Sequence, residues 1–496
     1  MRINLWWEQE MKNSIGWIII AGILATFIAA FFSWQLGFFC LVFMATAWWV
    51  WENPERGFWL LIVLAPILPM LKITQTIGTV TLIKDVIILT LFAKQFLWPL
   101  MRQTLPYRRA ALTAPIAGLV IWTIIEAVRA DSGVLLGVLR ARDIILYALL
   151  YFGVLYLPHS QKLMRRRLTW LLGSTVIVLL LGTYQWWWAM DSAVLRFDPV
   201  RMIWIPRISS TLGHPSIFGQ YVVSVSLLAA ALVIFGAGKK IKLGGATGWL
   251  LMIPFIWLTY SRSVWIGWLA GMGVVVISWG ATELTKRLSR RSLMKIVFSI
   301  GLLFALAIGG GLKLTPAGIY VKSFIDPRYA SNEERLEFVA RLIAPMTNVE
   351  AMVGKGLGDV MLQNFRQSDI EIYDLATGNS RSVQLIKNQT LVDNQYLKTG
   401  VEMGLVGLLI YGWIYWRFFR TCRINSNEFS PTSRIVGLWG GGFLTVFVIQ
   451  AFFIDIWDIW PTNAMFWIVA ALTAARSQMV LTDRNRNNKG QGRISV

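Results

Sequence analysis

A cluster of basic, hydroxyl and small residues precedes a long apolar run at residues 201–223, RMIWIPRISSTLGHPSIFGQYVV. Small residues follow Arg207 directly and would let a ligand approach the backbone, and hydroxyls and helix N-terminal amides favour anions. His214-Pro215 opens the apolar run, with proline near the first helical turn, where its missing N–H costs least. These residues predict an anion-binding corner that contains Arg207. Contacts with lipid headgroups are the simpler explanation of Arg201, and a structural role is the simpler explanation of His214.

Arg262 lies between two apolar runs in the segment LTYSRSVWIGWLAG (258–271), at the tip of an expected hairpin. A charge at membrane depth is costly and marks a functional site by default, although snorkelling to the interface is the alternative. The planar guanidinium makes bidentate hydrogen bonds to phosphate oxygens, which lysine does less well. Arg207 and Arg262 on neighbouring outer hairpins therefore predict a site for a diphosphate.

The segment VDNQYLKTGVEMGLVGLLIYGW (392–413) leads from a polar stretch into an apolar helix. Asp393-Asn394 is a good helix cap, and capping is the simplest role for it. A carboxylate at the membrane surface that faces the arginines can also take a proton from a sugar hydroxyl, as a general base does. We therefore expect Asp393 to act as the base, with Asn394 and Tyr396 beside it in support.

Other patterns give weaker signals. The glycines of GKGLGDV (354–360) lack the strand and the GK[ST] spacing of a phosphate loop, so a turn is expected there. Asp455 and Asp458 form an acidic, aromatic mouth that suits a sugar or a divalent metal, but no further metal ligands are visible. The sequence predicts neither a metal site nor a cofactor. Two ion pairs are expected within or beside the membrane, Glu126 with Arg129 and Arg142 with Asp143.

The composition indicates that these residues are held by membrane-spanning helices. The chain has 496 residues, of which 56% are hydrophobic and only 15% charged. Many runs approach the ~20 apolar residues that a spanning helix needs, and helices satisfy their own backbone hydrogen bonds in lipid. We expect an all-α polytopic membrane protein with about 12–14 transmembrane helices. The expected spans are 15–32, 36–51, 58–71, 80–98, 113–129, 140–157, 168–190, 216–236, 246–260, 262–280, 294–312, 398–416, 434–454 and 460–476.

The distribution of charge predicts the topology. The formal net charge is +21, and the basic residues concentrate in alternate short gaps between the spans, which argues against a nucleic-acid partner. By the positive-inside rule both termini are cytoplasmic, and the first apolar run, from Ile15, is expected to be a signal anchor. Only Cys40 and Cys422 occur, so no disulfide framework is expected.

These expectations divide the chain into four parts. Residues 1–312 form an N-terminal transmembrane bundle, 313–397 a large extracytoplasmic loop, 398–476 the C-terminal transmembrane helices, and 477–496 a basic, disordered cytoplasmic tail. Within the loop, Ser331 and Glu334 form a capping box that begins an amphipathic helix.

The order and spacing of these motifs over residues 200–415 resemble the bacterial O-antigen ligase and polysaccharide polymerase family. The resemblance implies an inverting, metal-independent glycosyltransferase of the inner membrane. Such an enzyme moves a glycan from an undecaprenyl-diphosphate carrier to an acceptor at the outer face. It also implies that Arg207 and Arg262 bind the diphosphate leaving group and offset its developing charge, with Arg335 as a third contact.

One departure bears on the acceptor. Lipid A-core ligases of this family carry histidine where this chain has Asp393, which favours a polymerase whose acceptor is another carrier-linked glycan. Aspartate is a weaker base, with an unperturbed pKa of about 3.9, unless its surroundings raise that value. A ligase that uses lipid A-core stays open, as does a transporter of an anion or lipid-linked substrate. Membrane lipids, a chain-length regulator and export-complex proteins are the further partners expected.

Overall fold

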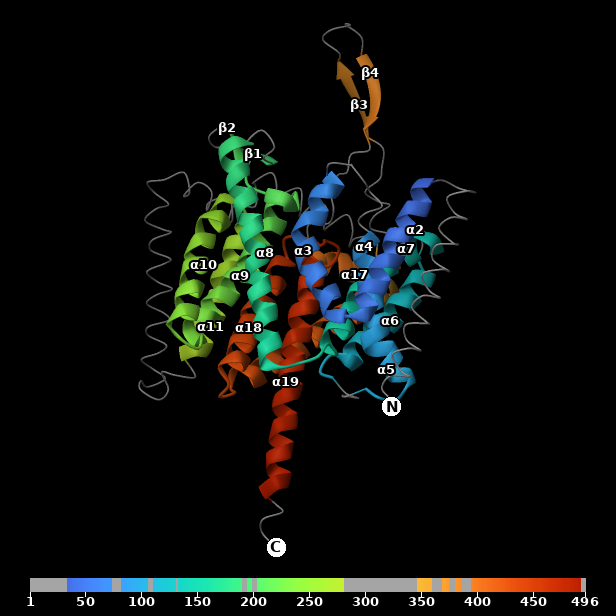
Figure 1. The fold of residues 1–496 in the computed structure, drawn as a ribbon. Helices are drawn as coiled ribbons and strands as arrows, with labels where there is room; N and C mark the ends of the chain where they lie inside the picture. Colours follow the sequence, from blue (N-terminus) through green and yellow to red (C-terminus); the bar gives the residue numbers. More distant parts are fainter. Residues whose placement is uncertain are drawn as a thin grey trace.

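The computed structural model describes residues 34–73, 82–105, 110–130, 133–189, 194–198, 203–280, 346–358, 368–373, 380–385 and 394–491. This part of the chain is a bundle of long helices with two short hairpins, which confirms the all-α class (Figure 1). The predicted spans 15–32 and 294–312 and the predicted helix at Ser331 lie outside the described residues.

The first half of the described chain is helical. Its elements are α2 (Trp34–Glu52), α3 (Pro54–Ile73), α4 (Ile83–Phe92), a π-helical turn (Ala93–Leu97), α5 (Trp98–Met101), α6 (Thr113–Val128), α7 (Val134–Leu155) and α8 (Gln161–Trp188).

The second half adds the hairpins. Its elements are β1 (Val194–Asp198), β2 (Ile203–Arg207), a 3-10 turn (Ser210–Leu212), α9 (Pro215–Phe235), α10 (Lys239–Leu258), α11 (Arg262–Trp279), α15 (Asn348–Val353), β3 (Ser368–Tyr373), β4 (Ser380–Leu385), α17 (Gln395–Ser426), α18 (Pro431–Gln450) and α19 (Thr462–Gln491). Both hairpins are antiparallel, with Val194 opposite Arg207 and Ser368 opposite Leu385.

Local sequence explains where these helices begin. Proline occupies the first helical position of α9 and of α18, where it sacrifices no helical hydrogen bond. Ser160 caps α8 by accepting a hydrogen bond from the N–H of Leu163. Among the described helices, α8, α9, α10, α11, α17 and α18 are long and apolar enough to cross a membrane.

The bundle has an inner and an outer layer. Most residues of α9 and α18 are buried, whereas α10 is largely exposed. In Figure 1, α9, α10 and α11 lie on one side and α2, α4, α6 and α7 on the other, with α17, α18 and α19 between them. The two hairpins lie at the end of the bundle opposite the C-terminus (Figure 1).

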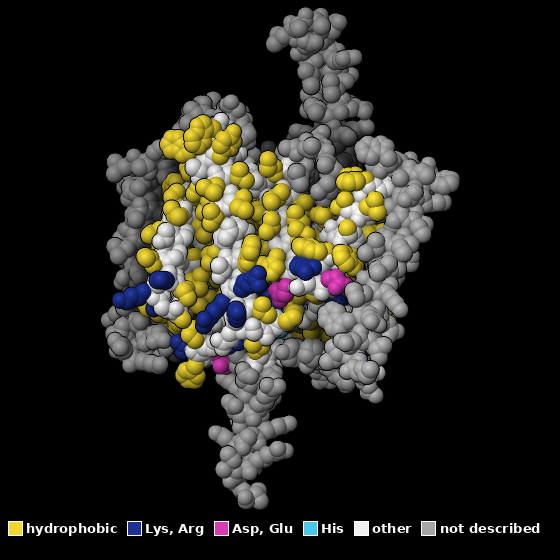
Figure 2. Space-filling model, viewed as in Figure 1, with side chains coloured by type: hydrophobic (Ala, Val, Ile, Leu, Met, Phe, Trp, Pro, Cys, Tyr) yellow, Lys and Arg dark blue, Asp and Glu magenta, His cyan; other side chains and the backbone are white. Residues whose placement is uncertain are grey.

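Basic side chains gather at the end of the bundle nearer the C-terminus, and apolar side chains cover the face above them (Figure 2). The exposed basic residues on the starts of α8 and α10 are Lys162, Arg165, Arg166, Lys239, Lys240 and Lys242. This distribution is what the positive-inside rule expects of a cytoplasmic end; the orientation in the membrane remains a prediction.

The C-terminal segment differs from the expectation. Residues 477–491 continue α19 as helix up to Gln491, although their basic, polar composition predicts a disordered tail. The buried first half of α19 supplies the nucleus, and adding one hydrogen bond per residue then extends a helix at low cost.

Candidate functional site

The two arginines predicted to bind a diphosphate are brought to one corner of the bundle. Strand β2 ends at Arg207, whose Nε donates to the carbonyl oxygen of Thr259 at 2.8 Å. The next amide, that of Ile208, donates to the carbonyl oxygen of Leu258 at 3.3 Å. Thr259 follows α10 directly, and α11 begins at Arg262. Arg207 is therefore fastened to the short turn that leads from α10 to Arg262, the first residue of α11.

Two helix N-termini meet in the same corner. The hydroxyl oxygens of Ser216 in α9 and Ser261 before α11 lie 3.1 Å apart, and those of Ser261 and Ser263 lie 3.2 Å apart. The positive ends of α9 and α11 consequently face one place, which favours an anion. Tyr260, with φ 44°, has a left-handed backbone conformation that is costly for a residue with a side chain and is typical of functional sites.

The small residues after Arg207 are held by α8. Gln185 accepts hydrogen bonds at Oε1 from the amides of Ser209 (3.0 Å) and Ser210 (2.8 Å). The hydroxyl of Ser210 donates to the carbonyl oxygen of Val178 at 2.7 Å. The amides of Ser209 and Ser210 therefore already have acceptors within the protein. The two serines serve to hold Arg207 in position.

His214 caps α9 in the structure. Its Nδ1 accepts a hydrogen bond from the N–H of Ser216 at 3.3 Å, and the side chain is exposed. Asn394 caps α17 in the same way, with Oδ1 accepting from the N–H of Leu397 at 3.0 Å. The hydroxyl of Tyr396 donates to the carbonyl oxygen of Val448 at 2.8 Å and so joins α17 to α18. Arg201, Arg335 and Asp393, the other predicted site residues, lie outside the described part of the chain.

A second polar cluster lies where the first turns of α17 meet α7 and the loop 451–461. Its members, here called the buried ion network, are Arg140, Lys398, Glu402, Asp455 and Asp458. Arg140 Nη2 lies 3.3 Å from a carboxylate oxygen of Glu402, and its Nη1 lies 2.5 Å from one of Asp458. The ammonium of Lys398 contacts Asp458 and lies 3.6 Å from an oxygen of Asp455. All five side chains are buried or nearly so.

The two aspartates of the network differ in their environments. Burial, together with the charge of Asp458, raises the pKa of Asp455 to about 7, although Lys398 and Arg140 act in the opposite direction. Burial also opposes the ionisation of Asp458, but its contacts with Arg140 and Lys398 lower the pKa of that carboxyl below its ordinary value. Within the described residues, no three His, Cys, Asp or Glu side chains are placed to share a metal ion.

The glycine-rich segment 354–358 forms a turn against α17. Gly354, Gly356 and Gly358 all have left-handed φ values, between 87° and 99°. A side chain at Gly354 would place its Cβ 2.5 Å from the carbonyl oxygen of Glu402, so only glycine fits. This geometry confirms a turn, and α15 before it begins with a capping box formed by Thr347 and Glu350.

Helix α17 is kinked where this turn contacts it. Gly404 has φ 65° inside the helix. The carbonyl oxygen of Val401 accepts from the N–H of Lys355 at 2.8 Å, and that of Met403 accepts from Trp122 Nε1 at 3.0 Å. The backbone groups freed by the kink are therefore satisfied by the glycine turn and by α6.

Sequence reasoning found some of these contacts and missed others. The expected pairs are confirmed: Arg129 Nη1 lies 2.6 Å from Glu126, and Arg142 Nη1 lies 3.6 Å from Asp143. Arg140 and Lys398 were not singled out. A cation within an apolar run is a signal in itself; Arg140 gives this signal, whereas Lys398 lies among polar residues at the start of its helix and gives none.

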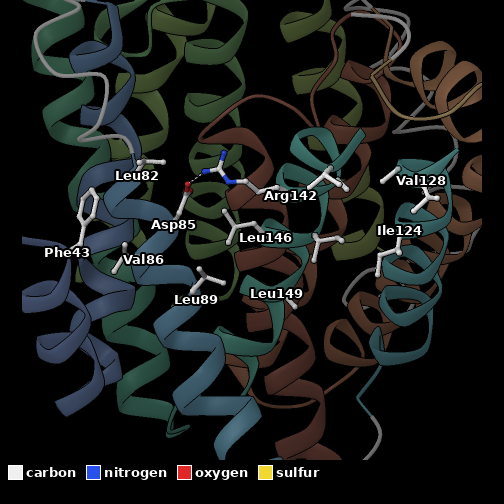
Figure 3. A pocket seen from close by; sticks show the side chains of 14 residues that line it. Phe43, Leu82, Asp85, Val86, Leu89, Ile124, Val128, Arg142, Leu146 and Leu149 are labelled. Atoms are coloured by element: carbon white, nitrogen blue, oxygen red, sulfur yellow. Dashed lines mark hydrogen bonds and ion pairs between the residues drawn. The ribbon is translucent and has the colours of Figure 1, made fainter. Parts of the chain in front are cut away.

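An apolar groove of about 660 Å³ lies between α2, α4, α6 and α7, apart from the arginine corner. Figure 3 shows Leu89, Ile124, Val128 and Leu149 lining it and an ion pair between Asp85 and Arg142 at one end. Several lining side chains are exposed, so this groove is part of the surface that would face lipid.

A family model described as O-antigen ligase matches residues 247–412, which run from α10 through Arg262 and the glycine turn to the middle of α17. A search of curated proteins gives no match.

Proposed function

We propose that this chain, whose residues 247–412 match a family model described as O-antigen ligase, transfers glycan units carried on undecaprenyl diphosphate. The reaction takes place at the outer face of the bacterial inner membrane, with both termini in the cytoplasm. The acceptor in our proposal is a second carrier-linked glycan, so that the product is a lengthened polymer.

The observation that carries the proposal is the junction of Arg207 and Arg262. Arg207 is tied to Thr259 at 2.8 Å, and Ser216 and Ser261 bring the starts of α9 and α11 within 3.1 Å of each other. Two guanidinium groups and two positive helix ends in one corner suit a diphosphate, which carries several oxygens and a concentrated negative charge. Arg335 from the outer loop is proposed as the third contact.

The chemistry follows from charge and proton balance. A hydroxyl of the acceptor sugar attacks the anomeric carbon of the donor as the bond from that carbon to the diphosphate oxygen breaks. Asp393 takes the hydroxyl proton, and the arginines stabilise the charge that develops on the departing carrier diphosphate. A single displacement of this kind inverts the configuration at the anomeric carbon. In this proposal no step uses a metal.

Asp393 is also the reason for proposing a polymerase. It occupies the position at which the resemblance implies histidine in lipid A-core ligases, so the acceptor side of the site differs from theirs. Asn394 and Tyr396 hold the first turn of α17 through a cap and a bond to α18.

The test uses purified protein in lipid with undecaprenyl-diphosphate-linked oligosaccharide as the only substrate. We expect a ladder of lengthening lipid-linked glycans and release of carrier diphosphate. Product that forms only after lipid A-core is added would show a ligase instead. Intact substrate that merely changes leaflet would show a transporter.

Three variants locate the site in this assay. Arg207→Ala and Arg262→Ala should each lower kcat about 100-fold, the usual cost of removing one donor to a developing anion. Asp393→Asn should lower it by a factor of about 10² to 10⁴. Arg423→Ala, which removes an exposed arginine near the end of α17, is the matched control and should leave kcat unchanged.

A further inference from the structure

Four separate segments of the chain meet at the buried ion network. Its charged groups come from α7, from the first turns of α17 and from the loop 451–461 between α18 and α19. The glycine turn adds the fourth segment, because the N–H of Gly358 donates to Glu402 Oε1 at 3.3 Å. The network is thus the place where the glycine turn is joined to three parts of the bundle.

The guanidinium of Arg140 connects α17 with the loop 451–461. Its Nε and Nη2 each lie 3.3 Å from Glu402 Oε2, while Nη1 lies 2.5 Å from Asp458 Oδ1. A guanidinium can hold two carboxylates in fixed directions, whereas an ammonium is a point charge on a flexible stem. Arg140 therefore sets the position of α17 relative to the loop 451–461.

Lys398 fastens the first turn of α17 to the same loop. Lys398 lies four residues after the cap at Asn394, and its ammonium contacts Asp458 and lies 3.6 Å from Asp455. Backbone bonds support this attachment, since the N–H of Gln395 donates to the carbonyl oxygen of Ala451 at 2.7 Å. The start of α17 is consequently attached to the loop by both charge and hydrogen bonding.

Such a network contributes more to geometry than to stability. Replacing buried ion pairs by apolar residues of similar volume is often neutral or stabilising, because desolvating the charges costs about as much as their attraction returns. A directional set of contacts, however, allows only one arrangement of the elements that it joins.

We propose that Arg140 and Lys398 are positioning residues for glycan transfer, which fix the start of α17 and the glycine turn relative to α7. The inference rests on the proposed function, in which Asp393 lies one peptide bond before the cap of α17. Consecutive Cα atoms are about 3.8 Å apart, so an error in the position of Asn394 is passed directly to the base.

The experiment compares four variants of the full chain in lipid nanodiscs: Arg140→Lys, Lys398→Met, Lys398→Arg and Arg167→Lys. Arg167→Lys is the matched control, because Arg167 is an equally buried arginine whose fork pairs with Glu55 near the other end of the bundle. Melting temperature, kcat, KM for the donor and amide hydrogen exchange are measured for each.

The expected result separates positioning from folding. Arg140→Lys and Lys398→Met lower kcat at least about tenfold, with KM for the donor within about twofold of the native value. Lys398→Arg keeps most of the native kcat, and Arg167→Lys lowers the melting temperature without lowering kcat. Exchange at residues 346–358 and 394–404 becomes faster in the first two variants only.

Two results would overturn the inference. One is a native kcat in folded Arg140→Lys and Lys398→Met, and the other is an equal loss of kcat in Arg167→Lys. A native chain that makes no product would instead contradict the proposed function. Hydrogen exchange would then still decide the positioning role, because unchanged exchange at residues 346–358 would refute it.

Discussion

Asp455 Oδ2 lies 3.6 Å from the ammonium nitrogen of Lys398, yet neither carboxylate oxygen of Asp455 accepts a hydrogen bond from any described residue. Asp458, three residues later, receives the closer contacts of both Lys398 and Arg140. The network therefore holds three carboxylates and two cations, and Asp455 is the carboxylate with the poorest compensation. It is the member whose charge state responds to pH near neutrality.

Asp455 should make the protein less stable as pH rises. Its pKa in the folded protein is about 7, above the value of about 3.9 for an unfolded chain. The folded state thus holds a proton that the unfolded state has lost, so the free energy of unfolding falls between about pH 4 and pH 7, by up to about 1.4 kcal/mol per pH unit. Thermal unfolding in nanodiscs at several pH values measures this slope.

Asp455→Asn is the control for that slope. The amide keeps the shape of the protonated acid and cannot ionise, so this part of the pH dependence should disappear and stability above pH 7 should rise. An unchanged slope in Asp455→Asn would show that another group is responsible.

The contact between Gly354 and α17 predicts a strong effect of a single methyl group. Gly354→Ala forces a side chain into φ 92° and places Cβ 2.5 Å from the carbonyl oxygen of Glu402. We expect a loss of at least about 1 kcal/mol in the free energy of unfolding, and lower transfer activity because the turn moves away from the network.

Gly412→Ala, at a glycine of α17 itself, provides the comparison. Gly412 lies in the second half of α17, and an added Cβ meets no described atom within 4 Å. Alanine is the better helix former by about 1 kcal/mol, so this variant should be equally or more stable. Similar losses in both variants would contradict the role assigned to the left-handed turn.

Substitutions of Gln185 test how far donor binding by Arg207 depends on the hydrogen bonds that hold Ser209 and Ser210. Gln185→Leu leaves the amides of Ser209 and Ser210 without their acceptor, which costs about 1–3 kcal/mol for each buried group. The segment that follows Arg207 then loosens, so KM for the donor should rise more than kcat falls. Gln185→Glu keeps an acceptor oxygen and should retain a KM closer to the native value, and equal KM values for the two variants would argue against this support.

The sequence predicts local features well and distant pairings poorly. The span expected at 262–280 is α11, Arg262–Trp279, because hydropathy along one helix is a local property. The pair Glu126–Arg129 was predicted for the same reason, since residues three apart share a helix face. The contact of Arg140 with Glu402 joins residues 262 positions apart. Nothing in the spacing of one sequence reveals such a pairing, which depends on how α7 and α17 pack.

The arginine corner shows the same division. The sequence singled out Arg207 and Arg262 from their charge and surroundings, and hairpins on one face were expected to be neighbours. The bond from Arg207 to Thr259 at 2.8 Å depends on the exact meeting of β2 with the end of α10. The sequence alone also does not predict the role of Gln185, because a single glutamine in an apolar helix forms no distinctive pattern.

Substitutions of His214 distinguish a structural role of this histidine from a chemical one. Its Nδ1 accepts the N–H of Ser216, and asparagine makes the same cap through its side-chain oxygen. His214→Asn should therefore retain near-native kcat and melting temperature. His214→Ala should lose about 0.5–2 kcal/mol of stability while keeping its activity per folded molecule. If His214→Asn folds normally but abolishes transfer, the imidazole itself takes part in the reaction, and a cap would no longer explain why this residue lies between Arg207 and the start of α9.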